Sequence, residues 1–225
     1  MSILAIIVGF LPGFAWLLFY LKEDLHPEPK RLLFLTFLAG AGFSMFALAL
    51  QLGFNGLLPA IGIEPLSLVA LLVLAAIEEC VKFAAAYAAI HNNPEFDEPV
   101  DAMIYMVVAA LGFATVENIG ALYGATPANV AFLGDIFETL SLRFVGATLL
   151  HTLTSALVGY FWAVSIRDFN SRRFVIEGLV VATLLHMVFN YLILLYDSFA
   201  YPVLFVLAVG FFVLNDFERL NKKTL

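Results

Sequence analysis

A small set of acidic, basic, imidazole and amide side chains lies inside the most apolar stretches of this sequence. The set consists of Glu78, Glu79, Lys82, Glu117, Asn118, His151, Ser155, His186 and Asn190. A charged side chain near the centre of a bilayer costs on the order of 2.5–3.5 kcal/mol, so the three Glu and the Lys together cost roughly 10 kcal/mol. Groups retained in such a place face one another rather than lipid, and they usually mark a functional site.

These residue types are sufficient to hydrolyse a peptide bond. The reaction needs an activated water, donors for the developing oxyanion, and a proton for the leaving amine. Two adjacent carboxyl groups in a low dielectric do not both ionise readily, and Lys82 favours the ionised form of one of them. One Glu can then act as the base while a proton is held nearby. His151 and His186, with Asn190 one turn farther on, can donate to an oxyanion, and no metal or other cofactor is required.

Other proteolytic designs fit the sequence less well. It contains no HExxH motif of the zinc peptidases and no pair of aspartates inside the apolar stretches, since Asp101 stands at a helix start. Ser155 follows His151 by one turn of the same helix, which is a poor geometry for serine attack. A zinc site formed by Glu78, His151 and His186 stays open as an alternative.

Each residue also has a structural interpretation. Glu78, Glu79 and Lys82 form an ion-pair network in one such interpretation, and the single imidazoles, amides and hydroxyls then only link helices. The spacing favours a shared site, because Glu78 and Lys82 are four residues apart and so lie on one helix face, as do the pairs that begin at His151 and His186. Depth agrees: at about 1.5 Å per residue from the predicted outer ends, Glu78 lies about 18 Å deep and the other helices' polar groups about 10–14 Å.

The elements that position these residues are membrane-spanning helices. Hydrophobic residues make up 63% of the 225 residues and charged residues 13%, against roughly 45–50% and about 25% in soluble proteins. The 11 Lys and Arg form no basic stripe and are outnumbered by 18 Asp and Glu, which argues against nucleic-acid binding. Cys80 is the single cysteine, so an intrachain disulfide is excluded. The sequence predicts an all-α, polytopic transmembrane helix bundle.

Seven stretches have about the 20 apolar residues that cross a bilayer. They are 3–21, 32–54, 66–90, 100–124, 142–166, 174–195 and 198–214. No Lys or Arg precedes the first stretch, so we expect a retained span rather than a signal peptide. Segment 125–141 is largely apolar and is predicted to be re-entrant or interfacial. We expect residues 1–225 to form one membrane-embedded domain.

Lys and Arg are distributed unevenly between the two sides of the predicted bundle. Loop 22–31, loop 167–173 and the tail after 214 hold three each, while loop 91–99 holds none. Because cytoplasmic loops carry an excess of Lys and Arg, this pattern predicts an outer N-terminus and an inner C-terminus.

IEECVKF contains an EExxK motif and FATVEN an FxxxEN motif, and HTLTS and HMVFN each begin with a histidine. These four ordered motifs resemble those of the PrsW family of glutamic-type intramembrane proteases, distant relatives of the CAAX prenyl endopeptidases. KEDLHPEPKR and FDEPVDAMIY resemble the family's Glu-Pro segment and its FDExxDGxxY stretch. Ala102 stands where Gly is expected. Asn190 replaces the Asp of some members and so gives His186 a neutral partner.

The resemblance implies an endopeptidase that cuts a single-pass membrane protein, such as an anti-sigma factor, on its extracytoplasmic side. It implies that Glu78 activates the water, that Glu117 helps to orient it, and that His186 with Asn190 forms the oxyanion hole. We therefore expect Glu78, Glu79, Glu117, His151, His186 and Asn190 to be catalytic, with Lys82, Asn118, Ser155 and Asp101 supporting them. The expected partners are the bilayer and the substrate, in a prokaryotic cell membrane.

Two other functions use the same residues. Buried Glu and His chains relay protons in proton-coupled transporters. The sequence lacks the repeat symmetry and the matching Gly/Pro-broken helices that are typical of many transporters. A non-catalytic membrane scaffold is the other alternative, and the complete polar set argues against it.

Overall fold

The computed structural model describes residues 3–20, 27–124, 142–167 and 171–224, and regular structure in this part is helical throughout. The α-helices are α1 (Ile3–Tyr20), α2 (Lys30–Ile61), α3 (Leu68–Ile90), α4 (Asp101–Gly124), α6 (Leu149–Arg167), α7 (Arg172–Leu195) and α8 (Ala200–Thr224). A π-helical turn, η1 (Arg143–Thr148), leads directly into α6. The predicted all-α class is confirmed, and each of the seven described α-helices overlaps one predicted span.

Local signals set several helix ends. Ser67 begins α3, since its side chain accepts a hydrogen bond from the Ala70 N–H. The helix α2 runs past the predicted end of its span at 54 and stops at Gly62, whose φ of 68° is the left-handed conformation of a helix C-cap. The helix α8 likewise continues beyond 214 into its polar tail. Bilayer thickness limits an apolar stretch, but it does not end a helix.

Among the residues that the structure describes, four helices are long and apolar enough to cross a membrane, judged by length and composition, so the chain is a multi-span membrane bundle. They are Lys30–Ile61, Asp101–Leu122, Arg143–Arg167 and Arg172–Leu195. The helix α3 has the length to cross but carries Glu78, Glu79 and Lys82, and the described apolar parts of α1 and α8 are shorter. Seven crossings and the N-out orientation therefore stay predictions. The segment 125–141, predicted to be re-entrant or interfacial, lies outside the described residues.

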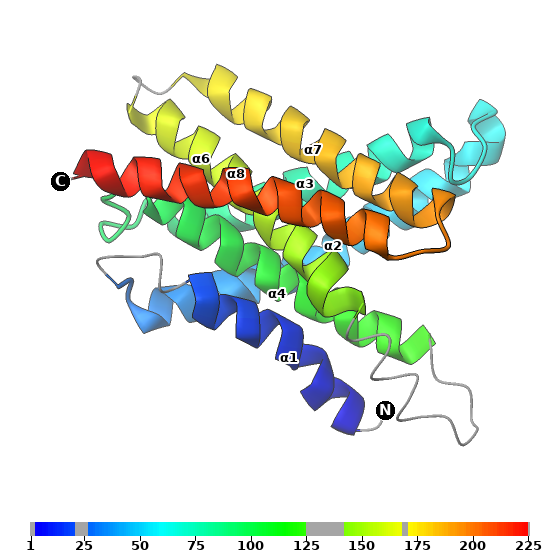
Figure 1. Cartoon of the computed structure of the whole chain (residues 1–225), viewed down its shortest axis with the longest axis horizontal. Helices are drawn as coiled ribbons and strands as arrows, with labels where there is room; N and C mark the ends of the chain where they lie inside the picture. Colours follow the sequence, from blue (N-terminus) through cyan, green and yellow to red (C-terminus); the bar gives the residue numbers. More distant parts are fainter. Residues whose placement is uncertain (1–2, 21–26, 125–141, 168–170, 225) are drawn as a thin grey trace.

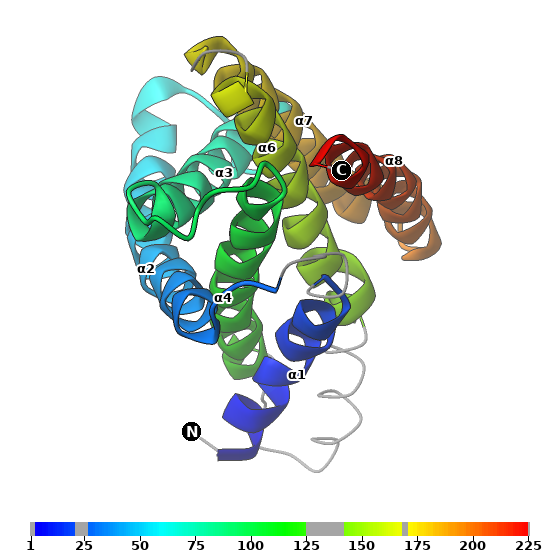
Figure 2. The same cartoon turned by 90° about the vertical axis from the view of Figure 1, so that its left-hand side faces the viewer.

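The helices α4 and α6 form the centre of the bundle. The most apolar stretch of Asp101–Leu122 is 83% buried and that of Arg143–Arg167 is 72% buried. The corresponding stretches of α2 and α7 are each 28% buried. The helix α4 contacts α1, α2, α3 and α6, and α6 also contacts α3, α7 and α8. The end-on view shows these two helices surrounded by the others (Figure 2). The start of α1 and the end of α8 lie toward opposite ends of the bundle (Figure 1).

Small residues bring α2 and α4 into backbone contact. A Cβ added at Gly40 of α2 would lie 1.9 Å from the carbonyl oxygen of Ala109, and one added at Gly112 of α4 would lie 2.0 Å from that of Phe37. Only glycine permits so close an approach, as is common between membrane helices. The two helices cross at this contact, and their C-terminal ends then separate (Figure 1).

Candidate active site

Polar side chains from several helices converge in the bundle interior. The helix α3 contributes Glu78, Glu79 and Lys82, which lie on adjoining helix faces because they are one, three and four residues apart. The helices α4, α6 and α7 contribute Glu117, His151 and His186, and all of these side chains are linked by the contacts described below. The structure thus brings together the residues of the four motifs, as the spacing and depth predicted.

Glu79 is held by three donors on one oxygen. Its Oε1 accepts from Lys82 Nζ at 2.6 Å, from Thr154 Oγ1 at 3.1 Å and from His186 Nδ1 at 2.7 Å. The side chains of Glu79 and Lys82 are 0% exposed, so each compensates the buried charge of the other. With its Oε1 in these contacts, Glu79 orients its neighbours.

Glu78 has one oxygen held and the other without a hydrogen bond. Gln51 Nε2 of α2 donates to Oε1 at 2.7 Å. Within the described part of the chain, the buried Oε2 has no hydrogen-bond partner. It faces His186 Nε2 at 3.6 Å and His151 Nδ1 at 3.9 Å, which leaves all three atoms able to share one small ligand.

The hydrogen bonds assign the two imidazole tautomers. Lys82 Nζ, which has only donors, lies 3.1 Å from His151 Nδ1, so this nitrogen accepts and the ring proton is on Nε2. That Nε2 lies 2.8 Å from Glu117 Oε2. In the same way His186 Nδ1 donates to Glu79, and its Nε2 faces Glu78. Each imidazole is therefore fixed by one carboxylate while its other nitrogen faces Glu78 Oε2.

Glu117 connects the cluster to the π-helical turn. Arg143 Nη2 lies 3.5 Å from Glu117 Oε2, and Arg143 Nε donates to Asn118 Oδ1. Asn118 Nδ2 in turn donates to Thr148 Oγ1 at 3.1 Å. Arg143 is the first residue of η1, a π-helical turn of the kind that occurs frequently at functional sites, and it lies beside Glu117.

Within the described part of the chain, three predicted residues make no hydrogen bond or ion pair with the cluster. Asp101 stands sixteen residues before Glu117 on α4, about 24 Å away, where its Oδ2 accepts from the backbone N–H groups of Asp97 and Glu98. Ser155 is buried one turn from His151, and its Oγ has no partner in the described part of the chain. Asn190 is half-buried one turn beyond His186.

Three contacting residues were not identified from the sequence. Gln51 is the one amide in the stretch 32–54, which is a signal that could have drawn attention to it. Arg143 is one charge near a predicted helix end, and Thr154 is a small polar residue next to Ser155, so neither is conspicuous in the sequence. Their partners lie 27, 25 and 75 residues away in the chain, so spacing along one helix gives no sign of these contacts.

The residues also fit a metal ion. One ligand atom from each of Glu78, His151 and His186 lies within 4.8 Å of the other two. Two His and one Glu with a fourth position open are a known donor set for catalytic zinc. Glu79 and Glu117 hold the opposite nitrogen of each imidazole, as outer carboxylates of zinc sites do. The Lys82 ammonium opposes such an ion, since it occupies the accepting nitrogen of His151.

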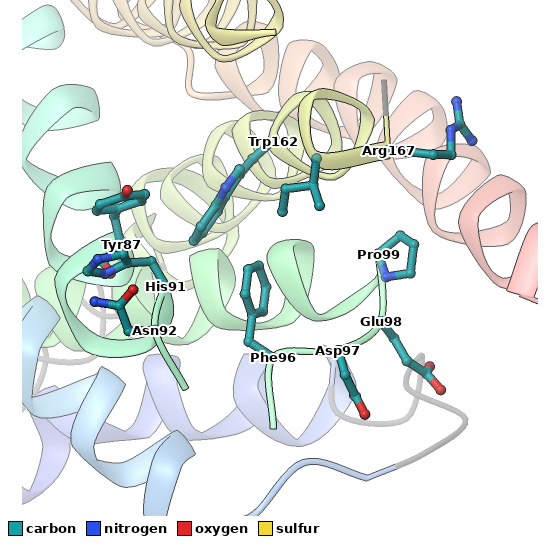
Figure 3. A pocket seen from close by; sticks show the side chains of 10 residues that line it. Tyr87, His91, Asn92, Phe96, Asp97, Glu98, Pro99, Trp162 and Arg167 are labelled. Carbon is teal, nitrogen blue, oxygen red and sulfur yellow. The ribbon is translucent and has the colours of Figure 1, made fainter. Parts of the chain in front are cut away.

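A separate cavity of 520 Å³ lies toward the other end of the bundle (Figure 3). Tyr87 of α3, Trp162 of α6 and Phe96 of the α3–α4 connection point into it, and Arg167 lies at its rim (Figure 3). None of the cluster's side chains lines this cavity. The reactive groups are therefore not placed there.

Comparison with known proteins agrees with the motifs. A model of the family described as "PrsW family intramembrane metalloprotease" matches residues 28–215. Protease PrsW of Geobacillus kaustophilus is 30% identical over 94% of this chain and 89% of its own length. Those of Oceanobacillus iheyensis and Bacillus subtilis are each 26% identical, over 96% and 87% of this chain and 96% and 85% of their own lengths. No solved structure matches the chain significantly.

Proposed function

Because the chain belongs to the PrsW family of intramembrane proteases, we propose that it cuts a single-pass membrane protein with a water that Glu78 activates. The observation that carries this proposal is the environment of Glu78 Oε2. This oxygen is buried, has no hydrogen-bond partner among the described residues, and faces nitrogens of both His151 and His186. A carboxylate oxygen so placed is available to take a proton from water.

The neighbouring groups support distinct roles in this reaction. Gln51 fixes the other oxygen of Glu78, so that Oε2 keeps its direction. Glu117 and Lys82 hold His151, and Glu79 holds His186. When its Nε2 also carries a proton, His186 is suited, with Asn190 one turn farther on, to donate to the oxyanion that forms when water attacks the peptide carbonyl. The proton taken by Glu78 then passes to the leaving amine.

The position of the cluster supports a cut on the extracytoplasmic side. Glu117 and His186 lie in the C-terminal halves of α4 and α7, and His151 lies at the start of α6. The distribution of Lys and Arg predicts that these helix ends are outside. We propose a plasma-membrane protein of a bacterium, since the relatives are bacterial, with a substrate such as an anti-sigma factor.

The family description includes a metal. Glu78, His151 and His186 are the residues that would hold a zinc ion, which when bound supplies a Lewis acid and a more readily ionised water. The remaining residues keep the same work in either case: Glu79 and Glu117 fix the two imidazoles, and the protein excludes bulk water from them.

Cleavage of a tagged single-pass protein by the purified full-length chain tests the proposal. Glu78→Gln keeps the shape of the side chain and removes the base, so we expect cleavage to fall by about 10²–10⁴-fold. Glu177→Gln, which alters only a surface pair with Arg173, is the matched control and should cleave normally. Undiminished cleavage by Glu78→Gln would refute the role of this residue, and absent cleavage together with proton flux into liposomes would favour the transporter.

A chelator in the same assay tests the metal. Loss of cleavage on chelation, with recovery on addition of zinc, would assign Glu78, His151 and His186 as ligands. If a chelator leaves cleavage unchanged, Glu78 activates the water without a metal ion. The zinc content of the purified protein provides a second readout.

A further inference from the structure

A groove between α2 and α4 leads to the reactive cluster. Its volume is 560 Å³, and we define this α2–α4 groove by Met45, Leu48 and Gln51 of α2 and by Val116, Glu117 and Gly120 of α4. Two of these residues contact the cluster directly, since Gln51 donates to Glu78 and Glu117 holds His151. The groove and the reactive centre are therefore continuous.

The shape of the groove follows from the crossing of its two helices. The backbones touch at Gly40 and Ala109, and a Cβ at Gly40 would overlap that carbonyl. About three turns farther along α4, a Cβ at Gly120 would meet nothing within 4 Å. The helices thus separate toward their C-terminal ends (Figure 1), and a wedge opens on the side predicted to be extracytoplasmic.

Exposure of the cluster's side chains increases toward this groove. In the described part of the chain, Glu79 and Lys82 are 0% exposed, and both imidazoles are 4% exposed. Glu78 reaches 12%, Arg143 22% and Glu117 30%. An extended backbone that reaches Glu78 therefore meets the least protein by passing Glu117, which lines the groove.

The lining indicates what the groove accepts. Its outer part is apolar, and Met45 and Leu48 are 57% and 46% exposed, so it suits the side chains of a membrane-spanning segment. Its inner end carries the polar atoms of Gln51, Glu117 and Arg143. Non-helical backbone at membrane depth is tolerated only where protein or a wet cavity satisfies its N–H and C=O groups. A peptide bond in an intact helix is shielded, so the groove suits a segment that is unwound there.

We propose that the α2–α4 groove is the docking surface of the substrate, and that it takes the unwound outer end of a single apolar span. This proposal rests on the proposed function. Because unwinding precedes docking, the protein selects spans with low helix propensity at their outer ends, such as those that contain glycine there. Arg143 donates to the freed backbone carbonyl groups, and the backbone reaches Glu78 past Glu117.

Cysteine crosslinking tests the docking surface without requiring cleavage. The probe is a tagged single-pass protein with a span of about 20 Leu and Ala residues, glycine near its outer end, and one cysteine. The protease carries Cys80→Ser, which removes its single cysteine, and Glu78→Gln, which preserves the probe. We expect Met45→Cys to crosslink at least tenfold more than Phe46→Cys. Phe46 is the matched control. It is the next residue of α2 and is 56% exposed, but it does not line the groove.

A blocking variant gives a second, kinetic test. Gly120→Phe fills the groove, whereas Gly53→Phe adds the same side chain elsewhere, and an added Cβ meets nothing within 4 Å at either position. With Glu78 intact, we expect Gly120→Phe to lower kcat/KM at least tenfold and Gly53→Phe to leave it unchanged. A probe that lacks the glycine should be cut at least tenfold more slowly.

The outcomes separate this proposal from the proposed function. Equal crosslinking from Met45→Cys and Phe46→Cys, or normal cleavage by Gly120→Phe, would overturn the docking surface while cleavage itself still stands. Selective crosslinking at Met45→Cys, with no cleavage by the protein in which Glu78 is intact, would support the docking surface. It would count against the proposed protease activity.

Discussion

Glu78 and Glu79 are neighbours in the sequence but have opposite surroundings. Glu79 lies 0% exposed among three donors, one of which is the Lys82 ammonium. Glu78 receives one hydrogen bond, from Gln51, and keeps Oε2 without a partner among the described residues. Glu79 Oε2 also has no hydrogen-bond partner in this part of the chain. The difference is that Glu79 is paired with the Lys82 ammonium, whereas the unpartnered oxygen of Glu78 faces both imidazoles.

The stability of single variants should distinguish these two carboxylates. Glu79→Gln leaves Lys82 as an uncompensated buried charge, so we expect it to lower the free energy of unfolding by about 3–5 kcal/mol. Glu78→Gln should change it much less. Thermal unfolding of both variants in detergent gives the comparison, and adding Lys82→Met to Glu79→Gln should restore much of the loss. Equal melting temperatures for Glu78→Gln and Glu79→Gln would contradict this assignment.

Gln51 should affect the rate through the direction of Glu78. Gln51→Met keeps the volume and removes the donor to Glu78 Oε1. A hydrogen bond to a charged group contributes about 1.5–3 kcal/mol, so we expect kcat to fall about tenfold or more. Binding should persist, and crosslinking of the model substrate through Met45→Cys should remain selective. Unchanged kcat would show that Gln51 does not position the base.

At the scale of the elements, the crossing of α2 and α4 decides the architecture of the site. The same contact that brings Gly40 against Ala109 directs the later turns of α2 away from α4. Those turns place Gln51 beside α3 and leave the groove open along Val116 and Gly120. A side chain at the crossing would therefore disturb the site from a distance.

A matched glycine pair on α2 tests this crossing. Gly40→Leu forces a Cβ to within 1.9 Å of a backbone oxygen, whereas a Cβ at Gly42 meets nothing within 4 Å. We expect Gly40→Leu to lower the free energy of unfolding by about 3 kcal/mol or more, because backbone cannot give way as a flexible side chain can. Gly42→Leu should be neutral or slightly stabilising. Melting temperatures in detergent give the comparison, and similar values for the two variants would argue against the close contact.

At the scale of the whole molecule, the bundle has two unlike ends. The reactive cluster lies toward the end where α4 and α7 finish and α6 begins. The end where α6 finishes and α7 begins carries Arg167, Arg172 and Arg173. The positive-inside rule predicts that this second end is cytoplasmic.

Labelling of single cysteines tests the orientation. In the Cys80→Ser protein, Asp197→Cys lies between α7 and α8, and Glu95→Cys lies between α3 and α4, and both native side chains are exposed. We expect an impermeant maleimide to label Asp197→Cys in intact cells and Glu95→Cys only after permeabilisation. The reverse pattern would invert the bundle and place the cut on the cytoplasmic side.

The sequence alone determined that this chain is an all-helical, multi-span membrane protein whose buried Glu and His residues belong together. Lipid permits few structures other than helices and makes isolated charges costly, so apolar length and helical spacing were sufficient. Only the tertiary structure decided that the unpartnered oxygen of Glu78 faces both imidazoles, and that Gln51 and Arg143 complete the cluster. It also showed that Asp101 binds the backbone N–H of Asp97, at the end of α4 far from Glu117, and that a groove lies between α2 and α4. These features depend on which faces of distant segments meet. Side-chain packing between helices decides this, and the pattern along a single helix does not.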